Sequence, residues 1–261
     1  ILNKKTVFWG HVWARKGKES KTEKIRNLMR KASSSLLLYT NNQKQELLNA
    51  YGEKCKKENE IFVAPNSLYY RNDMMNVLSS KSTGVIYVGR LVSSKKVDVL
   101  IKAIPLVCKV EPSIVFHIVG DGEQSNELKK ISRDLGIDEN VMFYGHIADH
   151  SKLKEIYSKS FVSISPGYVG LSITQSLSFG VPMLVSKDEN HSPELEALQT
   201  GLNGGFFNTN DPQSLADEIL KYFHGRQYNM FDGEKIVNDC KHRYSVETMV
   251  DGVIESVTQT R

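Results

Sequence analysis

The chain has 261 residues, of which 40% are hydrophobic and 25% are charged, a balance that is ordinary for a globular protein with a hydrophobic core. No run of 18 apolar residues occurs, so the sequence predicts no membrane-spanning helix. The three cysteines are scattered and lack metal-ligand spacing, which argues against a disulfide framework and favours a reducing cytoplasm. Because the chain opens with Ile1 and has no signal peptide, we expect a fragment that has lost its N-terminus.

Positive charge is concentrated at the start of the chain. Residues 1–31 contain ten Lys or Arg and two Glu, a net charge of +8, whereas the whole chain has a formal net charge of +4. Such a segment attracts anionic lipid headgroups, at about 1 kcal/mol per basic residue, or nucleic acid. No nucleic-acid-binding motif accompanies it, so we expect no nucleic-acid partner. Peripheral contact with an anionic membrane and a merely solvated helix face both stay open.

The first part of the chain alternates between short strands and helices. Strands are expected at residues 6–9, 36–39 and 61–63, and helices at about 20–31 and 43–51. The last strand leads to a Pro-Asn turn, after which the polar stretch 73–83 is expected to be a linker.

A regular alternation of strands and helices follows the polar stretch. Strands should begin near Val85, Ile114, Val141, Phe161, Pro182 and Gly205, with helices at about 97–110, 123–135, 151–158, 171–179 and 193–198. Strands that are apolar on both faces and alternate with helices predict a parallel sheet covered on both sides, and right-handed crossovers make it doubly wound. Pro105 should kink or split its helix.

Two capping residues predict the last helices. Asp211-Pro212 should begin a helix at about 213–223, because Asp is a favoured N-cap and Pro fits the first turn. Ser245 should cap a helix at about 246–258 in the same way.

Charged and glycine-rich segments follow the predicted strands at the edge where ligands bind in open parallel sheets. One strand ends at Gly89-Arg90, with Lys95 close behind, and a later strand ends before Gly167. A helix begins after Gly170, and its unpaired N–H groups and dipole favour an anion. Together with the two cations, this edge is suited to a diphosphate.

The pair Gly120-x-Gly122 invites comparison with a dinucleotide-binding fingerprint. That fingerprint follows the first strand of its unit and is answered by an acidic residue about 20 positions later. Here the pair follows the second strand, and the later region is Val141-Met142-Phe143. We therefore interpret these glycines as a tight turn.

Six short motifs, in order, resemble retaining glycosyltransferase family 4, which has the GT-B fold. They are Gly89-Arg90-Leu91 with Lys95 and Asp98-Val99-Leu100-Ile101; Val119-Gly120-Asp121-Gly122; Leu135-Gly136-Ile137 through Val141, Phe143 and Gly145; Gly170-Leu171 with Gly180-Val181-Pro182; Gly201-x-Asn203-Gly204; and Tyr244-Ser245 with Met249-Val250. The resemblance covers about residues 84–258, and residues 1–70 match less well.

The resemblance implies an α/β protein with one doubly wound Rossmann-like domain and part of a second. Residues 1–72 would be the C-terminal part of the acceptor-binding domain, roughly the first hundred residues of which would be absent. After the linker at 73–83, residues 84–245 would bind the nucleotide-sugar donor, and the helix at 246–261 would return to the first domain.

The resemblance also implies roles for individual residues. The catalytic candidates are His11, Arg90 and Lys95; the donor diphosphate and sugar would contact Gly89, Arg90, Lys95, Gly167, Tyr168, Val169, Gly170 and Leu171; and the nucleoside would contact Gly120, Tyr144, His146, Ile147 and Gln175. His191 and Glu194 are further candidates, although a Pro-Glu at a helix start often only compensates the helix dipole. No metal and no cofactor are expected, because basic side chains would neutralise the diphosphate.

Two positions depart from the family pattern of two glutamates spaced E-x7-E, namely Gly167 and Gln175. Gln175 still offers an acceptor and a donor for ribose hydroxyls. Gly167 lacks a side chain near the reacting carbon, so either the sugar sits closer to the backbone or transferase activity is weak or absent. We expect an active enzyme because the diphosphate-binding residues are intact.

The predicted function is the transfer of a sugar, with retention, from a nucleotide-diphosphate donor to a saccharide or lipid-linked acceptor, in polysaccharide or glycolipid biosynthesis. The expected location is the cytoplasm or the inner face of the membrane. Two alternatives stay open: a nucleotide-sugar 2-epimerase of the same fold, and a catalytically silent partner that still binds nucleotide sugar.

Overall fold

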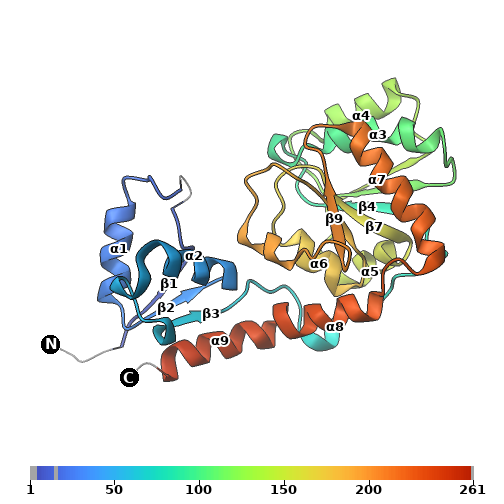
Figure 1. The fold of residues 1–261 in the computed structure, drawn as a ribbon. Coiled ribbons are helices and arrows are strands. Elements are labelled where there is room, and N and C mark those ends of the chain that lie inside the picture. The colour runs from blue at the N-terminus through green and yellow to red at the C-terminus, as the bar shows by residue number, and fades with distance from the viewer. Residues whose placement is uncertain (1–4, 15–16, 260–261) are drawn as a thin grey trace. The chain divides into compact units, whose positions relative to one another are not determined.

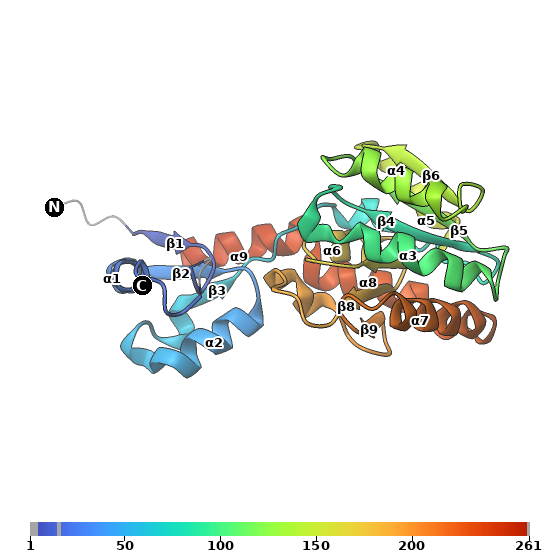
Figure 2. The ribbon, with the colours of Figure 1, turned by 90° about the horizontal axis from the view of Figure 1, so that it is seen from above.

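The computed structural model describes residues 5–14 and 17–259. The chain divides into two compact units: residues 1–71 with 242–261, and residues 72–241. Each unit contains a parallel β-sheet with helices packed against it (Figures 1 and 2). The expected fold class, a doubly wound domain with a partial second Rossmann-like domain, is confirmed.

The second unit is built on a six-stranded parallel sheet. Its strands are β4 (Gly84–Val88), β5 (Val115–Val119), β6 (Val141–Gly145), β7 (Ser160–Ser165), β8 (Met183–Ser186) and β9 (Gly204–Phe207). They are arranged in the order β6-β5-β4-β7-β8-β9. The order reverses between β4 and β7, which makes the carboxyl ends of these two strands the switch point at which ligands bind in such sheets.

Helices cover both faces of this sheet (Figures 1 and 2). They are α3 (Val97–Cys108), α4 (Ser125–Asp134), α5 (His150–Ser158), α6 (Ser172–Ser178), α7 (Pro212–Gly225) and α8 (Gly233–Tyr244). Helix α3 packs against both α4 and α7, and seven of its residues are buried. It is therefore apolar nearly all round, as a helix in the middle of a layer must be.

The chain also contains short 3₁₀ helices. They are η1 (Gly52–Lys54), η2 (Glu58–Glu60), η3 (Arg71–Asp73), η4 (Ser93–Lys95), η5 (Pro193–Ala197) and η6 (Arg226–Tyr228). The expected helix at 193–198 is thus only a 3₁₀ turn.

The structure differs from the sequence analysis at Pro105 and at α8. Pro105 does not split α3; it lies in the last turn, where its missing N–H removes one hydrogen bond from a helix held by packing on both sides. The sequence reading also missed α8, although Ile236, Val237, Cys240 and Tyr244 recur at helical spacing and are buried.

The first unit contains a three-stranded parallel sheet in the order β1-β2-β3. Its elements are β1 (Val7–Trp9), α1 (Glu23–Ala32), β2 (Ser35–Leu38), α2 (Asn41–Tyr51), β3 (Ile61–Val63) and α9 (Val246–Thr258). One face of the sheet packs with Leu47 of α2, and the other packs with Met249 and Val253 of α9. The Ser245 hydroxyl accepts the Thr248 N–H and caps α9 as expected.

The stretch 73–83 belongs to the second unit instead of being a free linker. Met74 is buried, and the N–H groups of Met75 and Val77 donate to the carbonyls of Ser178 and Phe179, at 3.0 Å in both cases. These bonds tie the stretch to the end of α6, a long-range contact that its polar composition does not reveal. The chain rejoins the first unit at His242, in the last turn of α8, a few residues before the expected boundary.

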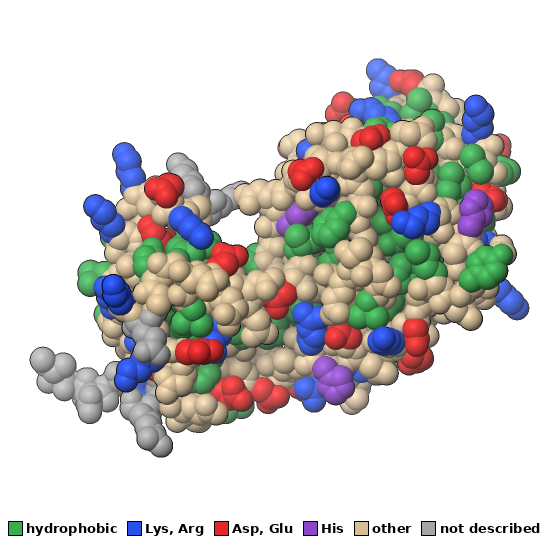
Figure 3. All heavy atoms as spheres, viewed as in Figure 1, with side chains coloured by type: hydrophobic (Ala, Val, Ile, Leu, Met, Phe, Trp, Pro, Cys, Tyr) green, Lys and Arg blue, Asp and Glu red, His purple; other side chains and the backbone are tan. Residues whose placement is uncertain are grey.

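The surface carries charges of both signs, and on the face drawn in Figure 3 acidic and basic side chains are interspersed over the second unit. Among the described residues, no helix is long and apolar enough to cross a bilayer.

All three cysteines carry free thiols, and burial raises the pKa of Cys55 and Cys108.

Replacing Gly252 with alanine should lower the free energy of unfolding of the first unit by about 1–3 kcal/mol, the usual cost of overpacking. A Cβ atom at this position would lie 2.1 Å from the Val63 carbonyl oxygen, where α9 crosses β3. Without that clash alanine would stabilise the helix by up to about 1 kcal/mol, so a more stable variant in urea denaturation would contradict the packing. Val257→Ala, at a 52% exposed site of α9, is the control.

Candidate functional site

Three loops meet at the carboxyl edge of the six-stranded sheet. They follow β4 (residues 89–96), β7 (166–171) and β8 (187–192). The first two flank the switch point between β4 and β7, and hydrogen bonds and one ion pair connect all three.

The β4 and β7 loops are joined through Tyr168. Its N–H donates to the Ser94 carbonyl oxygen at 3.0 Å, and its carbonyl oxygen accepts from Lys95 Nζ at 2.7 Å. The same ammonium group lies 4.7 Å from the centroid of the Tyr168 ring. One of the three N–H donors of Lys95 is therefore used in the hydrogen bond to Tyr168, and two remain for other acceptors.

Gly167 permits this close approach. A Cβ atom built on Gly167 would lie 2.5 Å from the Ser94 carbonyl oxygen, closer than Cβ atoms approach oxygen in proteins. The space of a side chain at this position is thus filled by the backbone of the β4 loop. That a donor sugar sits close to the backbone at Gly167 stays a prediction.

His191 joins the β7 and β8 loops. Its Nδ1 accepts the Val169 N–H at 3.1 Å, and its Nε2 lies 2.8 Å from the Ser186 carbonyl oxygen. A backbone N–H can only donate and a carbonyl can only accept, so the ring is neutral with its proton on Nε2. Burial lowers the pKa of His191 and favours this neutral form. The Ser192 N–H completes the joint by donating to the Val169 carbonyl at 3.1 Å.

Lys96 and Glu189 close the ring of loops by an ion pair between the β4 and β8 loops. Lys96 adopts a left-handed backbone conformation with φ 49° directly before α3. Neither Lys96 nor Glu189, nor Ser94, was a candidate from the sequence. The Lys95-Lys96 doublet is the one local hint, and no spacing relates it to Glu189.

Two cations stand at this edge. Arg90 is exposed, and no acceptor for its side chain is found in the described part of the chain. Burial, and then the neighbouring Arg90, lower the pKa of Lys95. A bound anion would offset both effects, so the pair is suited to a phosphate or diphosphate.

The predicted backbone donors of the β7 loop differ in availability. The Val169 N–H is already donated to His191, so the prediction that it contacts the donor does not fit this arrangement. The N–H groups of Gly170 and Leu171, just before α6, find no acceptor among the described residues. Gln175 is half-buried on α6, where its role toward a nucleoside stays a prediction.

The turn after β5 lies beside these loops, and its glycines are required by packing. A Cβ atom on Gly120, whose φ is +143°, would lie 1.8 Å from the Gly89 carbonyl oxygen, and one on Gly122 would lie 2.4 Å from the Leu91 carbonyl oxygen. The interpretation as a tight turn stays an interpretation; what the structure shows is that the backbone of the β4 loop approaches both glycines closely. The Gly120 N–H also donates to Gly145 at 2.8 Å.

The loop after β6 carries the remaining nucleoside candidates. His146 is exposed and Ile147 is half-buried. The Tyr144 hydroxyl instead hydrogen-bonds His117 Nδ1 at 2.9 Å, because the two side chains share one face of adjacent strands. His117 is a buried residue, and burial lowers its pKa to about 4.

The remaining candidates lie in the first unit and at η5. His11 follows β1, is exposed, and packs its ring 4.6 Å from that of Tyr39, with Gln43 Nε2 3.3 Å from its Nδ1. Glu194 is 6% exposed at the start of η5. Among residues 5–14 and 17–259, no three His, Cys, Asp or Glu side chains are grouped so that they could hold a metal ion.

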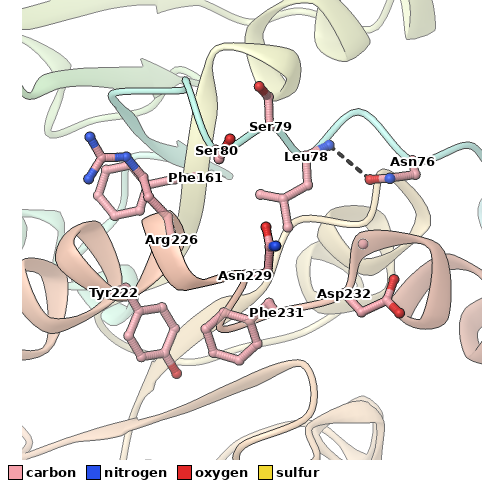
Figure 4. Close-up of a pocket in the computed structure, with 11 residues that line it drawn as sticks. Asn76, Leu78, Ser79, Ser80, Phe161, Tyr222, Arg226, Asn229, Phe231 and Asp232 are labelled. Carbon is pink, nitrogen blue, oxygen red and sulfur yellow. Dashed lines mark hydrogen bonds between the residues drawn. The ribbon is translucent and has the colours of Figure 1, made fainter.

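A cavity of about 450 Å³ lies at the opposite edge of the sheet, between residues 76–80 and 226–233 (Figure 4). Two of its polar atoms are engaged: Asn76 Oδ1 accepts the Leu78 N–H, and Asp232 Oδ1 accepts the Lys235 N–H. Arg226 points away from the centre of the cavity and lies over the Phe223 ring. The cavity is therefore separate from the edge where the cations gather.

Comparison with known proteins identifies the family. The sequence model of the glycosyl transferases group 1 matches residues 72–234, the unit that carries the three loops. The chain belongs to this family. A poly(ribitol-phosphate) alpha-N-acetylglucosaminyltransferase of Staphylococcus aureus is 23% identical over 218 residues, which are 84% of this chain and 42% of the relative.

Solved structures share the fold. A mutant of S. aureus TarM, in complex with fondaparinux, alpha-GlcNAc-glycerol and UDP, superposes with a TM-score of 0.74 at 20% identity, covering 98% of this chain and 51% of that one. Anabaena HepE, in complex with UDP, also gives 0.74, at 19% identity, covering 98% of this chain and 72% of that one. The chain spans less than half the length of the first curated relatives that it matches.

Replacing His191 with phenylalanine should loosen the β7 loop, because the ring shape is kept while both hydrogen bonds are lost. We expect the Val169 amide to exchange with solvent at least tenfold faster in hydrogen-exchange NMR, the effect of losing about 1.4 kcal/mol of local protection. His191→Asn, whose Oδ1 can replace Nδ1 as the acceptor, should restore most of the protection. An equal exchange rate of the Val169 amide in all three proteins would contradict its hydrogen bond to His191.

Proposed function

We propose that this protein is a retaining glycosyltransferase that moves a sugar from a nucleotide-diphosphate donor to a saccharide or lipid-linked acceptor. The observation that carries the proposal is the pair Arg90 and Lys95 at the switch point of a sheet whose chain belongs to the glycosyl transferases group 1. On the neighbouring loop, the N–H groups of Gly170 and Leu171 have no acceptor among the described residues.

The proposed role of the two cations is to hold the donor diphosphate and to stabilise the charge that develops on it as the bond to the sugar breaks. No acceptor for the Arg90 side chain is found within the residues that the structure describes, and Lys95 has two donors left after its bond to Tyr168. Fixed donors of this kind lower the barrier because they need no rearrangement during the reaction. They do the work that a metal ion does in other transferases, so we propose a metal-independent reaction without a cofactor.

The departing diphosphate, in this proposal, takes the proton of the incoming hydroxyl on the same face of the sugar, which retains configuration. No side chain at position 167 takes part, because the Ser94 carbonyl occupies that space. Gln175 would bond the ribose hydroxyls, and the loop around His146 would meet the base largely through its backbone. His11 is proposed to contact the sugar from the first unit.

The acceptor and the setting follow from the relatives. S. aureus and Bacillus subtilis relatives are named for poly(ribitol-phosphate) and poly(glycerol-phosphate) transfer, which supports a role in the synthesis of a cell-surface polysaccharide or glycolipid. We propose that the protein works in the cytoplasm, consistent with three free thiols. Because a UDP complex is known for two structural neighbours, uridine donors are the first to test.

Incubating the protein with a panel of nucleotide sugars and polyol-phosphate, saccharide and lipid-linked acceptors should release nucleoside diphosphate together with a glycoside, detected by mass spectrometry. The glycoside should keep the donor configuration by NMR, and the rate should survive EDTA. Binding without turnover would instead identify the silent partner suggested by Gly167 and Gln175, and a changed sugar still on its nucleotide would identify the epimerase.

Arg90→Ala and Lys95→Ala should each weaken donor binding by about 1.5–3 kcal/mol, the range for hydrogen bonds to charged groups. The difference in donor affinity between the parent and each variant should shrink at high salt, because charge pairing is screened. Lys102→Ala, which removes an exposed lysine paired with Asp98 on α3, is the matched control. Unchanged affinity of the Arg90 and Lys95 variants by calorimetry would contradict the assignment.

A further inference from the structure

Lys96 has a backbone conformation that lysine rarely adopts. The described part of the chain has three non-glycine residues with positive φ, namely Lys96 at 49°, Asn210 at 58° and Asn229 at 51°. Asparagine tolerates this left-handed region because its short polar side chain can hydrogen-bond the local backbone, and lysine has no such compensation. Outliers of this kind persist only where the surrounding structure holds them, and they cluster at functional sites.

The place of Lys96 in the fold is also unfavourable for its charge. It is the N-cap residue of α3, and its side chain makes no capping hydrogen bond. Helices favour Ser, Thr, Asp, Asn or Gly at this position, and the positive end of the helix dipole repels a cation. Local chemistry therefore does not account for Lys96, and a contact distant in sequence must hold it.

That contact is the ion pair with Glu189 on the β8 loop. Lys96 Nζ donates to Glu189 Oε1, and the two side chains are 29% and 14% exposed. The carboxylate offsets both the charge of the ammonium group and the positive end of the α3 dipole. Both residues lie in the second unit and within the range that the family model matches.

The ion pair anchors the short segment that contains Lys95. Ser94 and Lys95, the two residues that bond Tyr168, belong to η4. The Lys96 N–H closes η4 by donating to the Ser93 carbonyl oxygen at 3.1 Å, and α3 begins at the next residue. Since α3 is largely buried, the conformation of Lys96 sets how η4 joins a fixed helix. A shift of Lys96 would move the ammonium group of Lys95 with it.

The pair also completes a closed circuit of contacts among the three loops. The β4 loop is bonded to the β7 loop through Tyr168, the β7 loop to the β8 loop through His191, and the β8 loop to the β4 loop through the ion pair. In a closed circuit each loop is held from two sides. Without the ion pair, the β4 and β8 loops would each be held from one side only.

We propose that Lys96 and Glu189 are positioning residues for the donor diphosphate, an inference that rests on the proposed function. Their ion pair holds η4 so that Lys95 is in place before the donor binds. Donors that are fixed in advance lose little freedom when the ligand arrives and need no rearrangement during the reaction. Lys96 itself does not bind the diphosphate, because its charge is paired with Glu189.

Two double variants test the positioning at constant net charge. The neutral variant combines Lys96→Met with Glu189→Gln, and the swapped variant combines Lys96→Glu with Glu189→Lys. In the protein without ligand, the Tyr168 amide should exchange with solvent about fivefold or more faster in the neutral variant, because the β4 loop that accepts it is less restrained. The swapped variant should recover most of the protection, because an ion pair is restored.

Donor binding is measured by calorimetry with uridine diphosphate, and with inorganic pyrophosphate as a probe that does not depend on the base. Both should bind the neutral variant about fivefold or more weakly than the parent, the usual scale of coupling between sites, and the swapped variant nearly as tightly as the parent. Thermal unfolding of the neutral variant should stay close to that of the parent, because partly exposed ion pairs add little stability.

An exposed ion pair on α5 provides the matched control. Glu155→Gln with Lys159→Met removes two side chains that are 68% and 52% exposed, again at constant net charge. This variant should match the parent both in the exchange rate of the Tyr168 amide and in diphosphate affinity.

Contrary results separate this inference from the proposed function. A parent that binds neither uridine diphosphate nor pyrophosphate would contradict the donor site and overturn this inference as well. A parent that binds them, with a neutral variant of equal affinity, would overturn the positioning role alone. Weaker binding with an unchanged exchange rate of the Tyr168 amide would also overturn it, and would assign Lys96 to the diphosphate directly.

Discussion

The peptide groups of Tyr168 and Val169 are the constraint on which the candidate site depends. The Tyr168 N–H and carbonyl are bonded to the β4 loop, and those of Val169 to the β8 loop. Four backbone groups that would otherwise need water are thereby satisfied by protein, so the β7 loop has a defined path across the carboxyl edge of the sheet. The approach is close enough that position 167 must be glycine.

This constraint explains how charge is distributed at the edge. Lys95 contributes structure and charge together, because its ammonium group both joins two loops and faces Arg90. Lys96, its neighbour in sequence, has a left-handed backbone conformation, and its charge is neutralised by an ion pair with Glu189. The site therefore has two cations with available donors, matched to a ligand of about two negative charges, and His191 orients the loop without carrying charge.

The first unit shows how tertiary packing can reverse the usual use of an amphipathic helix. An ion pair between Arg30 and Glu23 is buried while Ile25 and Leu28 are left outside. Burying a charged pair rarely stabilises a fold as much as apolar residues of the same size would, so the ion pair fixes how α1 packs more than it adds to stability.

Local patterns determined the elements of this protein, and long-range contacts decided its site. Strand alternation predicted the doubly wound sheet, the caps at Asp211 and Ser245 marked two helix starts, and the motifs around Arg90 and Gly120 identified the edge; the roles of the site residues stay predictions. The bond of Lys95 to Tyr168, the His191 joint and the ion pair of Lys96 with Glu189 connect loops far apart in sequence, which no periodicity encodes. For the same reason the inward ion pair of α1 was invisible: helical spacing shows that a helix has two faces, and only packing against the sheet decides which of them is buried.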